Sequence, residues 1–289
     1  MPGSKSSWPL IKSGILQTNM NLDYCLWAML ATDYDDVDTI YYPVIGQPKL
    51  NGVRAKWDAE KKLFISRQGE VWREELLPHL YHRMQSLHPT TSLDGELFSP
   101  RLAFQDICAR VAVRRAKPHD DIAAIDFYAF DIINDQPSQI RIRDLETLYH
   151  PHIPSTLLDN GDVVWNYLRA MTTSGYEGII LRMFGVPYRV GRTEAVVKLK
   201  PWKYLACRVV SVIEGKGKLQ NSVGAFVVRA ETQPLQCKVG GGNITEARRR
   251  LLWDGREHIK GLALTIRYRD LSKDGKPLQP QIHVAPTLT

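Results

Sequence analysis

The most informative stretch of this 289-residue chain has eight residues, Gln47-Pro48-Lys49-Leu50-Asn51-Gly52-Val53-Arg54. In it, Lys49 is followed by a glycine three residues later and by an arginine five residues later. Glycine permits a tight bend that a side chain would obstruct, and the planar guanidinium group of arginine suits a phosphate or a ribose edge. The spacing indicates an amine nucleophile in a turn beside a phosphate. By itself, an ordinary solvated basic turn has the same pattern.

Charge is distributed unevenly along the chain. Residues 1–202 hold 23 Lys and Arg against 24 Asp and Glu, a net charge of −1, whereas residues 203–289 hold 15 against 7, a net charge of +8. A basic segment appended to a neutral one is typical of proteins that bind polyanions. The alternative is that these basic residues only keep a small β domain in solution.

Apolar runs and cysteines point to the cytosol. No apolar run approaches the roughly 18 residues that a membrane helix needs, and Leu26–Ala31 is too short, and follows Asp23 too closely, for a signal peptide. The cysteines are scattered and form no C-x-x-C pair: Cys25, Cys108, Cys207 and Cys237. Dispersed cysteines in a chain of this length indicate thiols in a reducing compartment rather than disulfides or a zinc site.

The pattern of apolar residues predicts an irregular arm at 1–25, a first domain at 26–202 and a second domain at 203–289. In the first domain we expect a hairpin at 53–66, helices at 74–86, 141–150 and 161–174, and strands at 92–98, 125–133, 178–183 and 195–199. Strands mixed irregularly with helices indicate an α+β fold with antiparallel sheets. In the second we expect strands at 206–214, 224–229, 236–239 and 263–268 and a helix at 245–253. About five strands with one helix fit an OB-fold barrel.

A nucleophilic lysine must lose its proton. A free lysine amine has a pKa of about 10.4 and is almost entirely protonated at neutral pH, so nearby positive charge is needed to favour the neutral form. Lys198 and Lys200 alternate on an expected strand and therefore share one face. There they can hold a triphosphate beside Lys49, although two lysines on an exposed edge strand give the same pattern.

Two glutamates and one aromatic residue complete the candidate pocket. Glu96 and Glu177 each adjoin a glycine in a short β segment, where a carboxylate can orient a ribose hydroxyl or bind Mg²⁺ through oxygen. Phe130 lies in an alternating strand and offers a face for stacking a purine. The competing readings are surface ion pairs for the glutamates and a place in the core for Phe130.

Six motifs occur in a characteristic order. After Gln47–Arg54 come Ser66-Arg67-Gln68-Gly69, Asp94-Gly95-Glu96-Leu97, Phe127-Tyr128-Ala129-Phe130-Asp131, Glu177-Gly178-Ile179-Ile180-Leu181-Arg182 and Val197-Lys198-Leu199-Lys200-Pro201-Trp202. From about residue 28 to its end, the chain resembles the covalent nucleotidyltransferases: ATP-dependent DNA ligases, RNA ligases and mRNA capping enzymes. The resemblance implies a nucleotidyltransferase (ATP-grasp-like ligase) domain followed by an OB-fold barrel, with ATP and Mg²⁺ or Mn²⁺ as cofactors.

The resemblance also implies a role for each residue. Lys49 would carry AMP covalently, and Gln47, Pro48 and Leu50 would border the nucleotide. Arg54 matches an arginine that contacts the ribose and the nick phosphate, and Arg67 one that contacts the 5′-phosphate. The remaining matches are Glu96 and Glu177 for ribose and metal, Phe130 for adenine, Arg192, Lys198 and Lys200 for phosphates, and Lys216 and Lys218 for DNA.

Within the superfamily, the chain looks most like small two-domain DNA ligases of viruses and phages, especially the algal-virus type. Gln47–Lys49 resembles their Thr-Pro-Lys, Ala103–Asp106 their Thr-Phe-Gln-Asp, and Val239–Gly242 with the following Glu246–Arg250 their barrel turn and helix. These matches predict a monomeric ligase that seals nicked duplex DNA in repair, replication or recombination. Its expected location is a bacterial cytosol or a phage- or virus-infected cell.

Three departures from the family pattern bear on this prediction. Asn51 stands where the family usually has Asp, which removes one negative charge near Lys49. Gln47 replaces a Glu or Thr that often meets adenine. The segment Glu214–Val223 is shorter than the insertion with which the algal-virus enzyme encircles DNA.

Three other functions remain open. An RNA ligase shares most of the motifs, a capping guanylyltransferase uses GTP, and an OB-type nucleic-acid-binding protein needs no reactive lysine.

Overall fold

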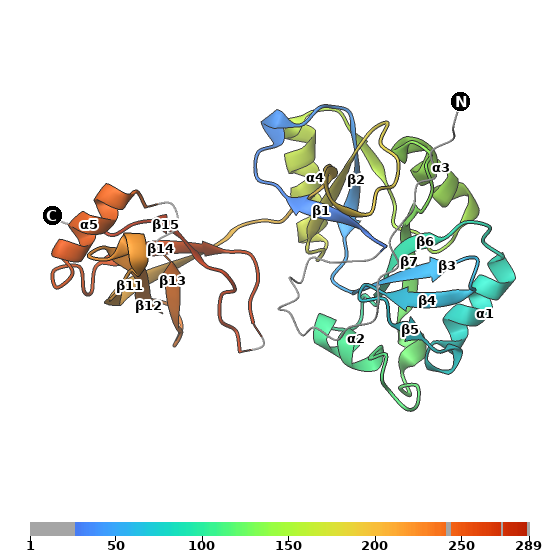
Figure 1. Cartoon of the computed structure of the whole chain (residues 1–289), viewed down its shortest axis with the longest axis horizontal. Coiled ribbons are helices and arrows are strands. Elements are labelled where there is room, and N and C mark those ends of the chain that lie inside the picture. Colours follow the sequence, from blue (N-terminus) through green and yellow to red (C-terminus); the bar gives the residue numbers. More distant parts are fainter. Residues whose placement is uncertain (1–26, 241–243, 273, 288–289) are drawn as a thin grey trace, which may run out of the picture. The chain divides into compact units, whose positions relative to one another are not determined.

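The computed structural model of the chain describes residues 27–240, 244–272 and 274–287 (Figure 1). These residues form two compact units. The first holds the described residues up to Thr32, Asn51–Ser155 and Arg182–Val197, and the second holds Asp33–Leu50, Thr156–Leu181 and the described residues from Lys198 onward. The predicted arm at 1–25 and part of the predicted barrel turn at 239–242 lie outside the described residues. The domain boundary at residue 202 stays a prediction.

An antiparallel sheet of strand order β5-β4-β3-β6-β7 positions several of the candidate residues. Its strands are β3 (Val53–Asp58), β4 (Leu63–Ser66), β5 (Val71–Trp72), β6 (Leu93–Phe98) and β7 (Asp126–Ile132). The predicted hairpin at 53–66 is confirmed, since β3 and β4 pair antiparallel. The register of β3 with β6 places Arg54 opposite Glu96, and the register of β6 with β7 places Asp94 opposite Asp131.

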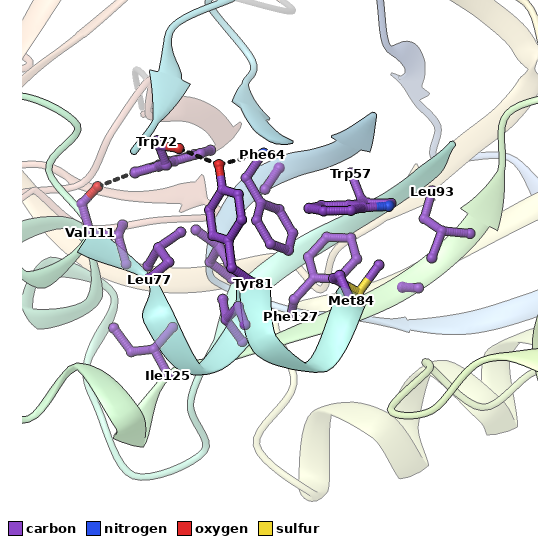
Figure 2. Packing of buried hydrophobic residues seen from close by; sticks show 14 of the residues in the cluster. Trp57, Phe64, Trp72, Leu77, Tyr81, Met84, Leu93, Val111, Ile125 and Phe127 are labelled. Carbon is purple, nitrogen blue, oxygen red and sulfur yellow. Dashed lines mark hydrogen bonds between the residues drawn. The ribbon is translucent and has the colours of Figure 1, made fainter. Parts of the chain in front are cut away.

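Aromatic side chains build the core beneath this sheet (Figure 2). Alternation along β3 and β4 turns Trp57 and Phe64 to one face, where their ring centroids lie 5.0 Å apart. Phe64 also makes edge-to-face contacts with Tyr81 at 5.3 Å and with Phe127 at 5.1 Å. The Tyr81 hydroxyl accepts a hydrogen bond from the Phe64 amide and donates one to the Trp72 carbonyl. Edge-to-face rings, with the Tyr81 hydroxyl hydrogen-bonded to two strands, support the strands of the sheet.

A second five-stranded sheet has the order β1-β10-β9-β2-β8. Its strands are β1 (Met29–Asp33), β2 (Val44–Lys49), β8 (Thr156–Leu158), β9 (Gly178–Met183) and β10 (Gly191–Leu199). Strand β2 is buried from Val44 to Pro48 and ends at the half-buried Lys49. Strand β2 therefore places Lys49 at its C-terminal end.

The helices begin where proline or a capping side chain permits. Helix α1 (Pro78–Leu87) starts at its proline after a 3₁₀ turn at Glu74–Leu76, so the predicted helix at 74–86 began four residues too early. Helix α3 (Ser138–Leu148) follows Pro137, three residues before its predicted start. Helix α4 (Gly161–Thr173) is capped by the Asn160 side chain. Helix α2 (Phe104–Arg110) was not predicted. None of the described helices combines the length and the apolar character needed to cross a bilayer.

Five strands from residue 203 onward close into a barrel of order β11-β12-β13-β15-β14. They are β11 (Lys203–Glu214), β12 (Val223–Ala230), β13 (Gln236–Gly240), β14 (Ala263–Tyr268) and β15 (Gln281–Val284). Closure comes from a parallel bridge between Gly240 and Gln281, and helix α5 (Glu246–Asp254) is capped by Thr245. The predicted OB-type barrel with one helix is confirmed, and β15 is the fifth strand that the sequence pattern left unplaced.

Candidate active site

Lys49 lies at the end of β2 and forms an ion pair with Glu177, the residue just before β9. The backbone fixes this pair, because the Glu177 amide donates a hydrogen bond of 3.1 Å to the Lys49 carbonyl. The second carboxylate oxygen of Glu177 forms an ion pair with Lys200. Exposure of the three side chains is 23% for Lys49, 14% for Glu177 and 15% for Lys200. One carboxylate thus bridges two largely buried ammonium groups.

Lys200 has a further partner, Asp270, whose Oδ2 lies 3.1 Å from its Nζ. Burial acts to lower the pKa of Lys200, but the hydrogen bonds and charges of Glu177 and Asp270 outweigh it and raise that pKa. Lys200 is therefore held as a cation, which is the state needed to bind a phosphate.

Lys198 has a carboxylate partner of its own. Its Nζ lies 3.1 Å from Asp33 Oδ2, and Asp33 also accepts a hydrogen bond of 3.0 Å from Arg269. Lys198 and Lys200 thus occupy alternate positions, as predicted, but contact different acids.

Because Gly178 has no side chain, the backbone next to Glu177 can lie close to strand β10. A Cβ atom at Gly178 would meet the Leu199 carbonyl oxygen at 2.2 Å. Any side chain there would push β9 away.

Arg54 is held on one edge by Asp94. Its Nε donates to Asp94 Oδ1 at 3.0 Å, and its Nη2 pairs with Asp94 Oδ2 and donates to the Met29 carbonyl at 2.7 Å. Burial acts to lower the pKa of Arg54, but Asp94 outweighs it and the pKa is raised. The guanidinium carbon also lies 5.2 Å from the ring centroid of Phe130 and 5.7 Å from that of Trp27. The group is permanently charged and fixed in orientation.

Glu96 contacts the turn after Lys49. Its Oε1 accepts a hydrogen bond of 3.2 Å from the Gly52 amide. A Cβ atom at Gly52 would lie 2.4 Å from the Leu97 carbonyl oxygen and 2.7 Å from Glu96 Cγ. The glycine of the K-x-x-G pattern is therefore required by close packing against β6, a more specific reason than the bend expected from the sequence.

A buried ionic network lies behind Phe130. Asp131 accepts hydrogen bonds from Arg141 at 2.8 and 3.1 Å and from Arg182 at 2.7 Å, and all three side chains are almost fully buried. A carboxylate removed from water needs such partners. Asp131 and Arg182 were not among the predicted site residues. The signal present in the sequence was their position within two of the motifs.

The other predicted residues are distributed along the chain. Gln47 is buried in β2, and Arg67 is half-buried in the turn after β4. Arg192 donates a hydrogen bond of 3.0 Å to the Ala31 carbonyl. Lys216 and Lys218 are exposed, the first just before and the second within a 3₁₀ turn at Gly217–Leu219. The described residues contain no group of three or more Asp, Glu, His or Cys suited to a metal ion.

Comparisons with known proteins agree with this fold. A family model described as the DNA ligase OB-like domain matches residues 214–283. A Haemophilus influenzae protein named DNA ligase is 27% identical over 240 residues, which cover 79% of this chain and 81% of that protein.

Solved structures give the same result. A structure from a study of DNA binding by Lig E DNA ligases has a TM-score of 0.64 at 23% identity and covers 89% of this chain and 98% of its own. The Chlorella virus DNA ligase–adenylate has a TM-score of 0.52 at 18% identity and covers 92% and 99%. The fold is thus that of an α+β nucleotidyltransferase domain with an OB-fold barrel. Within that class, the proteins that this chain resembles are DNA ligases, as the motifs predicted.

Proposed function

We propose that this protein is an ATP-dependent DNA ligase that seals nicks between a 3′-hydroxyl and a 5′-phosphate. The observation that carries the proposal is the Lys49–Glu177–Lys200 arrangement, in a chain similar to DNA ligases over most of its length. Lys49 shares a carboxylate with a second lysine, and because that carboxylate can accept its proton, the arrangement suits nucleophilic attack at a phosphate.

In the first step, the neutral Nζ of Lys49 attacks the α-phosphorus of ATP. A P–N bond forms, the bond from the α-phosphorus to the bridging oxygen breaks, and pyrophosphate leaves. As the triphosphate arrives, Lys200 turns from Glu177 to the phosphates, and Glu177 accepts the proton that Lys49 loses. Charge on the transferred phosphate is then stabilised by groups already in place.

In the next two steps, the AMP moves to DNA and is released. A 5′-phosphate oxygen at the nick attacks the α-phosphorus, the P–N bond breaks, and the Lys49 amine leaves with the proton returned by Glu177. The 3′-hydroxyl then attacks the 5′-phosphate and gives its proton to solvent. A phosphodiester forms, the bond between the 5′-phosphate and the adenylyl phosphate breaks, and AMP leaves.

The remaining residues bind the nucleotide and the nick. We assign Gln47, Pro48, Leu50 and Phe130 to the base, Glu96 to the ribose, Arg54 to the ribose and the nick phosphate, Arg67 to the 5′-phosphate, and Arg192, Lys198 and Lys200 to the phosphates. The carboxylates of Glu96 and Glu177 are ligands of the type that Mg²⁺ or Mn²⁺ prefers, and the ion would offset phosphate charge when bound.

The basic barrel is proposed to bind duplex DNA through its phosphates, with Lys216 and Lys218 among the contacts. Its net charge of +8 over residues 203–289 supports this role. We further propose a monomer in the cytosol, acting in DNA repair, replication or recombination. The described Cys108, Cys207 and Cys237 are free thiols, which agrees with a reducing compartment.

The test is to incubate the protein with α-labelled ATP or GTP and Mg²⁺ and then chase with nicked DNA or nicked RNA. We expect label from ATP on the protein and its transfer to nicked DNA. Lys49→Ala should abolish labelling. Lys56→Ala is the matched control, because Lys56 is also a largely buried lysine, paired with Asp58.

The other outcomes identify the rival functions. Label from GTP would indicate a guanylyltransferase, and transfer to RNA alone an RNA ligase. An unlabelled protein that still binds nucleic acid would indicate a binding module and would contradict the proposal.

A further inference from the structure

Tyr188 lies between β9 and β10 and has no role in the function described above. Its side chain is 7% exposed. Its hydroxyl accepts a hydrogen bond of 3.0 Å from the Met29 amide and donates one of 2.6 Å to Asp94 Oδ2. Both of these partners also contact Arg54, Asp94 through its carboxylate and Met29 through its carbonyl. Tyr188, Met29, Arg54 and Asp94 thus form a closed ring of hydrogen bonds.

This ring of hydrogen bonds occupies one edge of the Arg54 guanidinium group and leaves the other edge available for a ligand. Nε and Nη2 are occupied by Asp94 and Met29. Among the described residues, Nη1 has no hydrogen-bond partner, and the side chain is 19% exposed. A guanidinium group fixed on one edge presents its other edge in a single direction, which suits a phosphate oxygen.

The segment that carries Tyr188 is itself anchored. Arg141, buried and paired with Asp131, donates a hydrogen bond of 2.7 Å to the Val186 carbonyl. The Tyr188 amide donates one of 3.2 Å to the Asn134 carbonyl, and the Arg141 guanidinium carbon lies 5.8 Å from the Tyr188 ring centroid. The position of the Tyr188 hydroxyl is therefore fixed by the hydrogen bonds of the backbone around Tyr188 and by the contact of Arg141 with its aromatic ring.

We propose that Tyr188 is a positioning residue that acts through Asp94 to aim the free edge of Arg54 at the 5′-phosphate of a nick. The inference rests on the proposed ligase function. Burial and the charge of Asp94 raise the pKa of Tyr188 well above its ordinary value, so the hydroxyl keeps its proton and remains a donor. Without the Tyr188 hydroxyl, the Asp94 carboxylate loses one of its hydrogen-bond donors, and the side chains of Asp94 and Arg54 can rotate together.

The test compares two nicked duplexes that differ only in a 5′-phosphate or a 5′-hydroxyl at the nick. Dissociation constants are measured with the full chain, each variant being in the same adenylation state as checked by intact mass. The dissociation constant for the 5′-hydroxyl duplex divided by that for the 5′-phosphate duplex is the ratio that reports phosphate recognition. We expect Tyr188→Phe to lower this ratio about tenfold, the effect of losing one hydrogen bond to a charged group.

A double-mutant cycle separates positioning from a general effect on stability. In an Arg54→Ala background, Tyr188→Phe should change the ratio less than about twofold, because the two substitutions remove the same interaction. Tyr81→Phe is the matched control: Tyr81 is 5% exposed and its hydroxyl also accepts one backbone hydrogen bond and donates another. It should lower the melting temperature and leave the ratio unchanged.

Three results would overturn the proposal: an unchanged ratio in Tyr188→Phe, an equal fall with and without Arg54, or an equal fall in Tyr81→Phe. If Tyr188→Phe does not fold, 3,5-difluorotyrosine at position 188 retains the hydroxyl but alters its acidity. This substitution should change the ratio in the chain with Arg54 and leave it unchanged in the Arg54→Ala background. An unchanged ratio in the chain with Arg54 would again contradict the positioning role. Failure of the ligase proposal is distinct, because the native chain would then form no adenylate with ATP.

Discussion

Glu177 holds the ammonium group of Lys49 through one carboxylate oxygen while its other oxygen holds Lys200. This sharing links the proposed nucleophile to the residue proposed to bind phosphate. When a phosphate draws Lys200 away, Glu177 is left with Lys49 alone and can take its proton. The arrangement thus couples the arrival of ATP to activation of the lysine.

Glu177→Gln tests this coupling. The amide keeps the size of the side chain but cannot accept the proton as a carboxylate does. We expect the rate of Lys49 labelling by ATP to fall about a hundredfold, the usual contribution of a positioned base. Glu60→Gln, in an exposed turn, is the control and should label at the native rate. A native rate in Glu177→Gln would contradict the role of the carboxylate.

Gly52→Ala tests the packing beneath the catalytic turn. The new Cβ would meet the Leu97 carbonyl at 2.4 Å, and backbone cannot yield as a side chain can. We expect the free energy of unfolding to fall by about 1–3 kcal/mol, with slower labelling of Lys49. For Gly240→Ala, no atom lies within 4 Å of the new Cβ. Urea unfolding of both variants makes the comparison, and equal stabilities would count against the packing argument.

Asp131→Asn tests the buried network behind Phe130. The substitution keeps the shape but leaves Arg141 and Arg182 without their shared negative charge. We expect a loss of about 3–5 kcal/mol in the free energy of unfolding. Asp144→Asn, in an exposed pair with Arg143, is the control and should cost less than about 1 kcal/mol. A similar small cost at both positions would show that the network does not support the fold.

Cys207, in strand β11 of the barrel, is expected to make the free energy of unfolding depend on pH. Burial, and then the neighbouring Cys237, raise the pKa of the Cys207 thiol from 9.0 to about 11. Between these values the unfolded chain gives up this proton and the folded chain retains it. The stability that the thiol contributes is therefore complete below pH 9 and is lost as the pH rises through about 11.

Cys207→Ala should remove that pH dependence, which amounts to roughly 2–3 kcal/mol for a shift of this size. The measurement is the free energy of unfolding of the native and substituted chains at pH 8 and pH 11. The difference between them should shrink at the higher pH. A difference that is the same at both values would show that the thiol is not perturbed.

Lys216 and Lys218 allow a test of DNA binding by salt dependence. Each lysine that neutralises a phosphate contributes about 0.9 to the slope of log affinity against log salt. Replacing both by Ala should lower the slope by nearly two. Lys61→Ala, in an exposed turn outside the barrel, should leave the slope unchanged. An unchanged slope in the double variant would remove these two residues from the interface.

Local pattern was sufficient for much of the fold. The alternation at Val53–Ser66 gave the hairpin, and ordered motifs gave the nucleotidyltransferase and barrel architecture. Strands β5 and β8, of two and three residues, were missed because so short a segment has no measurable periodicity. The four-residue β15 was missed as well. The predicted start of helix α1 was too early, because the apolar spacing continued back through the 3₁₀ turn at Glu74–Leu76 that precedes Pro78.

The site was only partly predictable for a related reason. Lys49, Glu177 and Lys200 could be named from their motifs, but not that a single carboxylate bridges two lysines. Tyr188 could not be found at all, since its role depends on hydrogen bonds to residues 94 and 159 positions away in sequence. Contacts of this range are set by sheet register and loop anchoring, which leave no local signal.

Covalent attachment of AMP to Lys49 can be tested directly by peptide mapping with mass spectrometry. The native chain is incubated with ATP and Mg²⁺, digested, and searched for one added adenylyl group. We expect the adduct on the peptide that contains Lys49, its loss on addition of nicked DNA, and no adduct in Lys49→Ala. An adduct on another lysine, or none on the native chain, would show that Lys49 is not the nucleophile.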